Sequence, residues 1–360
     1  PLWDAPRDSG LPLVASSRAA LEQMSNTLLD AVSDWGVRNW LSSSTAKSQT
    51  MTVKGKFKRA PIIRMNGVTI PAVKQAKVLG VVFDEARSFS PHALSIGERA
   101  ANCFGKMSRI SASSWGVRFR ALSILDVGTY VSTLTYAAAV WYRRSSFYVV
   151  RSVLIRSQRQ ALVLLTKAYR STNSAALPLL AGVLPADLEV LRAGRVGEEG
   201  VGRAGRERAQ LKERVSGEVV SQWQERWATA ADGRELFSFF PSVAERLTSG
   251  WIEPDHQVSQ LLTSHGCFRS RLHKLALSDT PRCYCGDSDE TRDHILWHCS
   301  LYEDLRKAMF EKLTLPRVGP IGHQDLVGTK GNFSLFSMFA HEWHKRRRQL
   351  ELEDQYCHSI

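Results

Sequence analysis

The chain contains 360 residues, with 48 Lys and Arg against 35 Asp and Glu, so its formal net charge is +13. Such a surplus of cations favours a polyanionic partner, because each cation placed on a phosphate releases condensed counterions. No apolar stretch approaches the roughly 20 residues that span a bilayer, and no secretion signal is present. These features argue against a membrane partner and predict a protein of the nucleus and cytoplasm.

The first predicted element is an amphipathic helix at residues 17–35, where apolar side chains recur at three- and four-residue spacing. Ser16 or Ser17 can cap the start of this helix. Gly36 fits the position just past its end, where a left-handed residue is common.

Short β-prone runs follow this helix, at residues 50–53, 62–65, 68–70 and 78–83. Asn66-Gly67 between two of the runs is a strong hairpin signal, because both residues tolerate the positive φ of a type I′ turn. We therefore expect an α+β region that closes with a strand at 78–83.

From about residue 92 to 190 the pattern becomes helical, with helices expected at 100–110, 119–142 and 148–169. Basic side chains are spread over the last of these helices and its approach. A single Arg on a solvated helix face needs no partner, but a whole basic stripe is a candidate phosphate track. The residues predicted to form this track are Arg143, Arg144, Arg156, Arg159 and Arg170.

Residues 191–218 are rich in Gly, Arg and Glu, a composition that predicts a flexible or weakly helical linker and a domain boundary. The remainder, 219–360, regains aromatic residues that predict a packed, mainly helical domain. A basic run near its end is a further candidate phosphate contact. This run consists of Lys345, Arg346, Arg347 and Arg348.

The most specific pattern is a cluster of Cys and His with the spacing C-x-C-x8-H-x4-C. Its members are Cys283, Cys285, His294 and Cys299. Thiolates and imidazole suit Zn²⁺, which prefers four ligands in a tetrahedron. Four protein ligands leave no position for water, so the pattern predicts a structural zinc site.

His298 is an alternative fourth ligand, although it adjoins Cys299 and would point elsewhere on a helix. A short helix could present both His294 and Cys299, which lie a little more than one turn apart. Reduced cysteines without a metal, beside a surface histidine, are the alternative to a zinc site at this stage.

Several segments, in order, resemble the downstream part of the Pol polyprotein of non-LTR (LINE-type) retrotransposons, in particular the arthropod elements that insert into ribosomal DNA. They are SSRAALEQMSNTLLDAVSDWG, LSSSTAKSQTM, VKQAKVLGVVFDE, TYAAAVW, RSQRQALVLLTKAYRSTNSAALPLLAGVLPADLE, LLTSHGCFRSRLHKL and the C-x-C…H…C segment. The similarity extends over nearly the whole chain.

The resemblance implies the end of a reverse-transcriptase palm at 1–90, a helical thumb at 91–190, a linker at 191–218 and a nucleic-acid-binding domain at 219–360. Lys47 falls at the usual lysine of the palm, and Lys77 lies in the strand that grips the primer. The implied partners are element RNA and target DNA. The parent polyprotein is implied to be an RNA-directed DNA polymerase that uses Mg²⁺, with an associated endonuclease.

The start of the chain departs from this family. The palm signature, with two Mg²⁺-binding aspartates, should fall near residues 5–8, where Arg7 replaces the first aspartate and only Asp8 can match the second. A chain that begins at Pro1 also indicates a piece of a longer reading frame. We therefore expect no polymerase activity from this chain alone, and a non-catalytic, zinc-dependent nucleic-acid-binding protein is the alternative hypothesis.

Overall fold

The computed structural model describes residues 12–53, 55, 57–109, 111, 116–315 and 319–357. The chain divides into two compact units, the first ending at Ile96 and the second beginning at Gly97. Helices dominate the described residues, and two small antiparallel sheets complete the secondary structure. No helix in the described part is long and apolar enough to cross a membrane.

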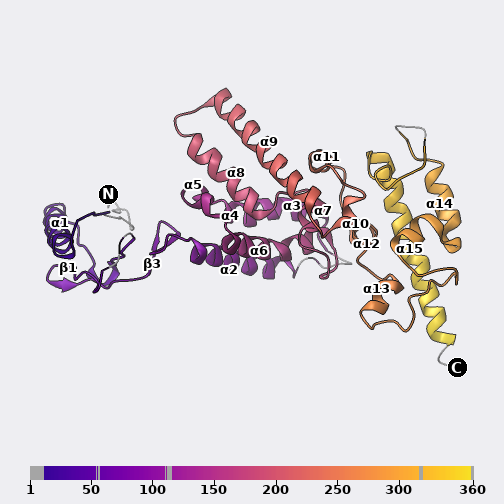
Figure 1. Cartoon of the computed structure of the whole chain (residues 1–360), viewed down its shortest axis with the longest axis horizontal. Coiled ribbons are helices and arrows are strands. Elements are labelled where there is room, and N and C mark those ends of the chain that lie inside the picture. Colours follow the sequence, from indigo (N-terminus) through magenta and orange to yellow (C-terminus); the bar gives the residue numbers. More distant parts are fainter. Residues whose placement is uncertain are drawn as a thin grey trace. The chain divides into compact units, whose positions relative to one another are not determined.

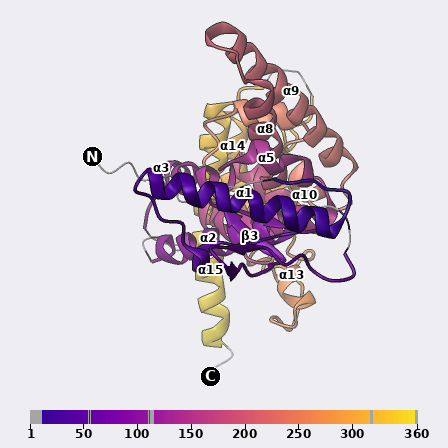
Figure 2. The same cartoon turned by 90° about the vertical axis from the view of Figure 1, so that its left-hand side faces the viewer.

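The first unit opens with α1, Arg18–Arg38, a single unbroken helix (Figure 2). The predicted helix and its cap are confirmed, since Ser17 Oγ accepts a hydrogen bond from the Ala20 amide at 3.2 Å. The predicted end at Gly36 is wrong, because α1 continues for two residues and Gly36 is buried inside it. Leu41 N–H donates to Gly36 O at 2.8 Å, and a Cβ at Gly36 would lie 3.0 Å from Leu41 O. The absence of a side chain at Gly36 therefore allows the backbone of Leu41 to pack closely against the end of α1.

The predicted hairpin at Asn66-Gly67 is confirmed by two paired strands, β1 (Arg64–Met65) and β2 (Val68–Thr69). Asn66 and Gly67 have φ of 51° and 77°, as a type I′ turn requires. Two polar side chains of α1, Glu22 and Asn26, hold this hairpin. They accept backbone hydrogen bonds from Ile62 and Arg64 at 2.7 and 2.8 Å.

A second hairpin, β3 (Gln75–Val78) and β4 (Val81–Asp84), stands where one strand was predicted. The single strand at 78–83 is wrong because Leu79 and Gly80 have φ of 46° and 83° and reverse the chain. At the predicted strand 50–53, Thr50 forms only an isolated bridge with Ala72. A short 3₁₀ turn, η1, covers Thr45–Lys47.

Helix α2 (Ser90–Met107) contains the division between the two compact units. The second unit continues with a series of short elements before a long helix. These are α3 (Phe119–Asp126), the π-helix η2 (Val127–Val131), α4 (Ser132–Leu134), α5 (Ala138–Trp141), the 3₁₀ helix η3 (Tyr142–Arg144) and α6 (Tyr148–Thr166). The predicted continuous helix at 119–142 is wrong, because Ala137 adopts a left-handed conformation with φ of 50°.

The core of the second unit forms around α6. Its buried positions are Val150, Leu154, Gln158, Ala161, Leu162, Leu165 and Thr166. Their three- and four-residue spacing places one face of α6 against α7 (Ala176–Ala181) and α8 (Ala186–Glu199).

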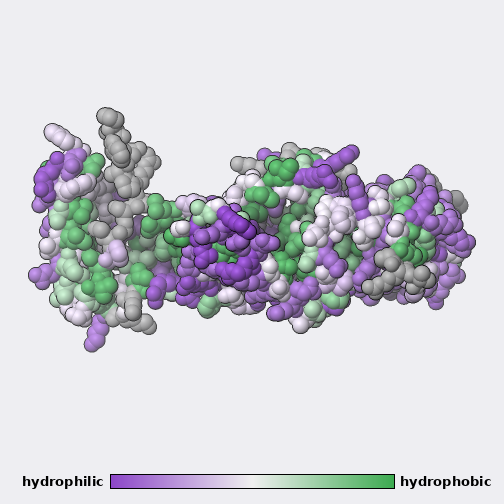
Figure 3. All heavy atoms as spheres, turned by 90° about the horizontal axis from the view of Figure 1, so that it is seen from above, coloured by the Kyte–Doolittle hydropathy of each residue, from purple (hydrophilic) through white to green (hydrophobic). Residues whose placement is uncertain are grey.

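Residues 191–218, predicted to form a flexible or weakly helical linker, are mostly helical. They lie mainly in α8 and α9 (Gly205–Thr229), two helices that run side by side as a hairpin (Figure 1). Seen from above, the exposed side chains of this hairpin form a strongly hydrophilic surface (Figure 3). Arg195 and Arg214 each pair with Glu199 and Glu218, which joins the two helices.

The glycines that suggested flexibility have a packing role in α8. A Cβ at Gly194 would lie 2.2 Å from Cβ of Tyr142, and one at Gly197 would lie 3.2 Å from Cβ of Ala139. Glycine therefore allows α8 to approach α5 and η3 closely.

The C-terminal part contains α10 (Arg234–Phe237), α11 (Val243–Thr248), α12 (His256–Thr263), α13 (Arg269–Lys274), the π-helix η4 (His294–His298), η5 (Ser300–Tyr302), α14 (Glu303–Phe310) and α15 (Lys330–Cys357). The expected aromatic packing is confirmed, since Trp223, Trp227, Phe239 and Phe240 are buried. Trp343 of α15 stacks on Phe268, with ring centroids 5.3 Å apart.

Candidate metal centre and nucleic-acid interface

Two of the predicted zinc ligands lie on a tight loop before η4. Cys283 N–H donates to Ser288 O at 2.8 Å, and Gly286 N–H donates to Cys283 O at 3.0 Å. Gly286 has φ of 84°, a conformation that glycine adopts without steric cost. The loop therefore doubles back and directs the side chains of Cys283 and Cys285 toward one point.

The other two ligands lie at the ends of η4. Cys299 N–H donates to His294 O at 2.7 Å, the five-residue spacing of a π-turn. One wide turn thus returns the chain to the same side after five residues. The prediction that a short helix presents His294 and Cys299 together is confirmed.

The ligand atoms of Cys283, Cys285, His294 and Cys299 all lie within 4.8 Å of one another. The Sγ atoms of Cys283 and Cys299 are 3.6 Å apart, and Cys285 Sγ lies 3.2 Å from His294 Nε2. A tetrahedral zinc with Zn–S bonds of about 2.3 Å separates two sulfurs by roughly 3.8 Å, so the cluster fits this ion. His298 is exposed and does not belong to the group.

The immediate surroundings orient the ligands. Ser288 Oγ lies 2.9 Å from His294 Nδ1, which leaves Nε2 as the nitrogen that faces the cysteines. Arg306, which is buried, donates to Cys299 O at 2.6 Å and to Ile295 O at 3.2 Å. Sequence reasoning missed both Ser288 and Arg306, because no spacing rule marks the residues around a ligand set.

The cluster disfavours thiolate charge in the absence of a cation. The hydrogen bond with Cys299, followed by burial, raises the pKa of the Cys283 thiol well above its ordinary value. Burial is the main cause that lowers the pKa of His294. A divalent cation would supply the missing positive charge.

A buried ion pair connects the loop between the ligand pairs to α15. Glu290 and Arg347 are 0% and 3% exposed, and Arg347 Nε lies 2.9 Å from Glu290 Oε1. Glu290 also accepts from Arg269 N–H at 3.0 Å, and its carbonyl accepts from Ser270 Oγ at 2.7 Å. The loop, α13 and α15 are therefore held by one residue.

The predicted nucleic-acid contacts fall into two groups, of which the first is free to bind. Its six members are exposed and form no ion pair with the residues that the structure describes. They are Lys47, Lys77, Arg156, Arg170, Lys345 and Arg348.

The second group is engaged within the protein. Arg143 pairs with Glu198 at 2.6 Å. Arg159 donates to Ser174 Oγ and to backbone carbonyls of the loop after α6. Arg346 pairs with Asp304 at 2.7 Å. Arg144 is only partly engaged, since it lies over the Phe147 ring but forms no ion pair with the described residues.

The prediction that Arg347 contacts a phosphate is wrong, because its side chain is buried and paired with Glu290 and Glu351. Arg347 belongs to the basic run only in sequence. The weak candidate metal ligand of the palm, Asp8, lies outside the described residues.

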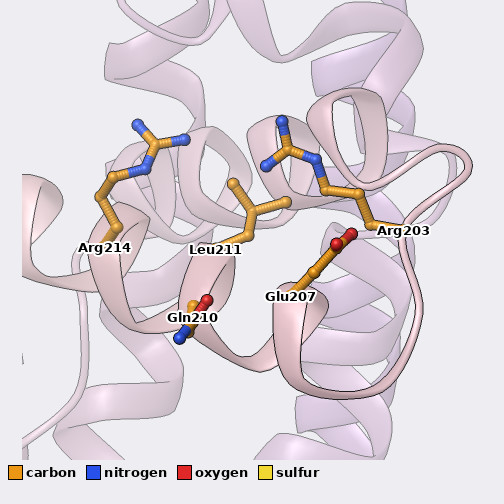
Figure 4. A pocket seen from close by; sticks show the side chains of 5 residues that line it. All are labelled: Arg203, Glu207, Gln210, Leu211 and Arg214. Carbon is orange, nitrogen blue, oxygen red and sulfur yellow. The ribbon is translucent and has the colours of Figure 1, made fainter.

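A surface hollow of about 560 Å³ lies at the turn between α8 and α9, lined by Arg203, Glu207, Gln210, Leu211 and Arg214. Figure 4 shows the two arginines on either side of Leu211, with Glu207 beside Arg203. Arg214 is already paired with two glutamates. An exposed hollow with both signs of charge lacks the enclosed lining of a ligand pocket, so we assign it no chemistry.

Comparison with curated proteins identifies relatives of one kind. The chain is 31% identical over 361 residues to "Retrovirus-related Pol polyprotein from type-1 retrotransposable element R1" of Bradysia coprophila, with 95% of the chain and 36% of the relative covered. It is 31% identical over 350 residues to "Putative 115 kDa protein in type-1 retrotransposable element R1DM" of Drosophila melanogaster, with 93% and 34% covered. The chain thus spans about a third of the length of these two relatives.

A third relative is of more similar length. The chain is 31% identical over 303 residues to "Retrovirus-related Pol polyprotein from type-1 retrotransposable element R1 4" of Nasonia vitripennis, with 80% of the chain and 76% of the relative covered. No protein-family profile matches the chain, and no solved structure matches it. The resemblance read from the sequence is confirmed, and the chain belongs to the family of Pol polyproteins from R1 type-1 retrotransposable elements.

Proposed function

We propose that this chain is the part of an R1-type Pol polyprotein that follows the catalytic aspartates of the polymerase. It comprises the end of the palm at 1–90, the thumb at 91–190 and a zinc-dependent nucleic-acid-binding part at 219–360. The parent polyprotein copies element RNA into DNA from a nicked target, using Mg²⁺ at its polymerase site, and also contains an endonuclease. The observation that carries the proposal is the assembled Cys283, Cys285, His294 and Cys299 cluster in a chain of this family.

The metal is Zn²⁺ in a structural role. Three thiolates and one imidazole suit its borderline-soft character, and four protein ligands leave no open coordination position. Each of the four ligands lies on a loop or turn. Ser288 orients the His294 ring, and Arg306 binds the carbonyl of Cys299. The cation stabilises the fold, because a preformed site is absent from the unfolded chain.

Metal analysis of the purified full chain tests this assignment, with about one zinc per chain expected. His294→Ala should lose the metal, whereas His298→Ala, a matched control on the same turn, should retain it. A metal-free wild-type chain, or zinc lost from the His298 variant and kept by the His294 variant, would contradict the proposal.

The partners are element RNA and target DNA. The six exposed basic residues described above, together with a net charge of +13, support binding to the phosphate backbone. Binding should weaken steeply with salt, because each phosphate contact releases a counterion. A double substitution of Arg156 and Arg170 by Gln should reduce the slope of log K against log salt, whereas Arg208→Gln in α9, an exposed arginine outside the track, should leave it unchanged.

A second candidate function is nucleic-acid binding without catalysis. It is favoured by Arg7, which stands where the first palm aspartate is expected. Both candidates predict that the chain alone adds no nucleotides to a primer on an RNA template, so primer extension tests the feature that they share. Extension activity would overturn the assignment of the catalytic residues to another part of the polyprotein.

A further inference from the structure

The segment from residue 127 to 186 contains no Asp or Glu. Seven basic residues fall within it: Arg143, Arg144, Arg151, Arg156, Arg159, Lys167 and Arg170. The overall sequence contains about one acidic residue for every ten, so a segment of this length without any is unusual. The start of α6 therefore has no carboxylate nearby in sequence to neutralise its arginines. Glu198 pairs with Arg143 at 2.6 Å and also accepts a hydrogen bond from the Tyr142 hydroxyl.

Large apolar side chains are exposed where α6 begins. Phe147, Tyr148 and Val149 are 55%, 76% and 58% exposed, whereas Val150 and Leu154 on the opposite side of the helix are buried at 1% and 0%. The core therefore accounts for one face of α6 but not for the two aromatic rings at its start. Phe147, Tyr148 and Val149 are adjacent, and a contiguous exposed apolar patch marks a candidate interaction site.

One guanidinium group lies over a ring, and a second arginine follows close by in the helix. Arg144 Cζ lies 4.8 Å from the Phe147 ring centroid, and Arg151 follows one turn later, with its amide bonded to Phe147 O at 2.8 Å. Neither arginine forms an ion pair with any part of the chain that the structure describes. Cations beside exposed π-faces match a ligand that carries both phosphates and flat bases.

We propose that Phe147 and Tyr148 form a platform on which unpaired bases of a single strand stack, while Arg144 and Arg151 bind the adjoining phosphates. The proposal rests on the nucleic-acid binding proposed above and specifies the form of the ligand. A duplex keeps its bases paired and stacked inside, so it offers phosphates to the arginines but no π-face to the rings. The surplus of basic residues in the segment 127–186 favours a nucleic acid over an apolar protein segment as the occupant.

The test compares binding of the full chain to a fluorescein-labelled 12-nucleotide single strand, as RNA or DNA, and to a duplex of the same length. Tyr148→Ala should weaken single-strand binding on the order of 5- to 100-fold, since one stacked base contributes about 1–3 kcal/mol. Duplex binding should change less than twofold. Tyr148→Trp should retain the affinity, and Tyr148→Leu, which keeps an apolar side chain, should lose it.

Val149→Ala is the matched control, because it removes a similarly exposed apolar side chain without a π-face from the same turn. Its affinity for the single strand should equal that of the wild type. Equal losses for single strand and duplex, or an unchanged affinity in Tyr148→Ala, would overturn the stacking platform while leaving the proposed function in place. A wild-type chain that binds neither ligand would instead refute the proposed function itself.

Discussion

Replacement of Arg347 by Met distinguishes a structural from a nucleic-acid-binding role for the basic run of α15. Arg347 and Glu290 bury their charged groups almost completely, 2.9 Å apart. Removing one partner of a buried pair leaves the other charge uncompensated and costs about 3–5 kcal/mol. We expect the free energy of unfolding of the C-terminal region to fall by that amount, with increased hydrogen exchange along α15.

The loss should depend on pH in a defined direction. Burial already raises the pKa of Glu290 above its ordinary value, despite the nearby arginine. Without Arg347 this pKa rises further, so the destabilisation is smallest below the unfolded pKa and grows as pH increases through the folded pKa. Urea unfolding at pH 5 and pH 8 should therefore show the larger loss at pH 8.

Two companion variants make the test decisive. Arg347→Met combined with Glu290→Leu should recover much of the stability, because an apolar replacement of a whole buried pair is often nearly neutral. Arg348→Gln, at an exposed neighbour, should leave stability unchanged and reduce salt-sensitive binding. Reduced nucleic-acid binding in Arg347→Met with unchanged unfolding free energy would refute the structural role.

Two further predictions concern the second unit. Burial raises the pKa of Asp126 to about 6, so ionisation of this carboxyl destabilises the fold as pH rises from about 4 to 6. Asp126→Asn should therefore stabilise the protein by on the order of 2–3 kcal/mol at pH 7.5 but little at pH 4. An equal gain at both pH values would contradict this reasoning. Gly194→Ala should lower the free energy of unfolding by at least about 1–3 kcal/mol through overpacking against Tyr142. Gly217→Ala, where the added methyl group meets open space, should raise the Tm slightly. Similar Tm shifts for both variants would refute the close-packing argument.

Local signals in the sequence predicted local structure well. Ser17 caps α1 and Asn66-Gly67 forms a hairpin because each depends only on a few adjacent residues. The four candidate metal ligands were found for the same reason, since a tight loop and one π-turn bring them together within seventeen residues. His294 was preferred over His298 because His298 adjoins Cys299, and in the structure His298 is exposed and lies outside the cluster.

Features that depend on distant partners were missed. Arg347 reads as part of a basic run because its partner Glu290 lies 57 residues away in sequence. The turn at Leu79-Gly80 was predicted as part of one continuous strand, because apolar residues continue on both sides of it. The helices at 191–218 were read as a flexible or weakly helical linker because the segment has few large apolar residues. Leu211 and Val215 among them are buried, and an ion-pair network between α8 and α9 accompanies their packing.

The glycine positions of α8 carry a consequence for mutational tolerance. A Gly- and Arg-rich segment looks like the part of a chain in which substitutions accumulate freely. At Gly194, however, even the smallest added side chain meets Tyr142, whereas the exposed Arg206 and Arg208 of α9 form no ion pair with the described residues. Variation among functional copies of this segment should therefore alternate between freely replaced charged positions and a small number of positions that accept glycine alone.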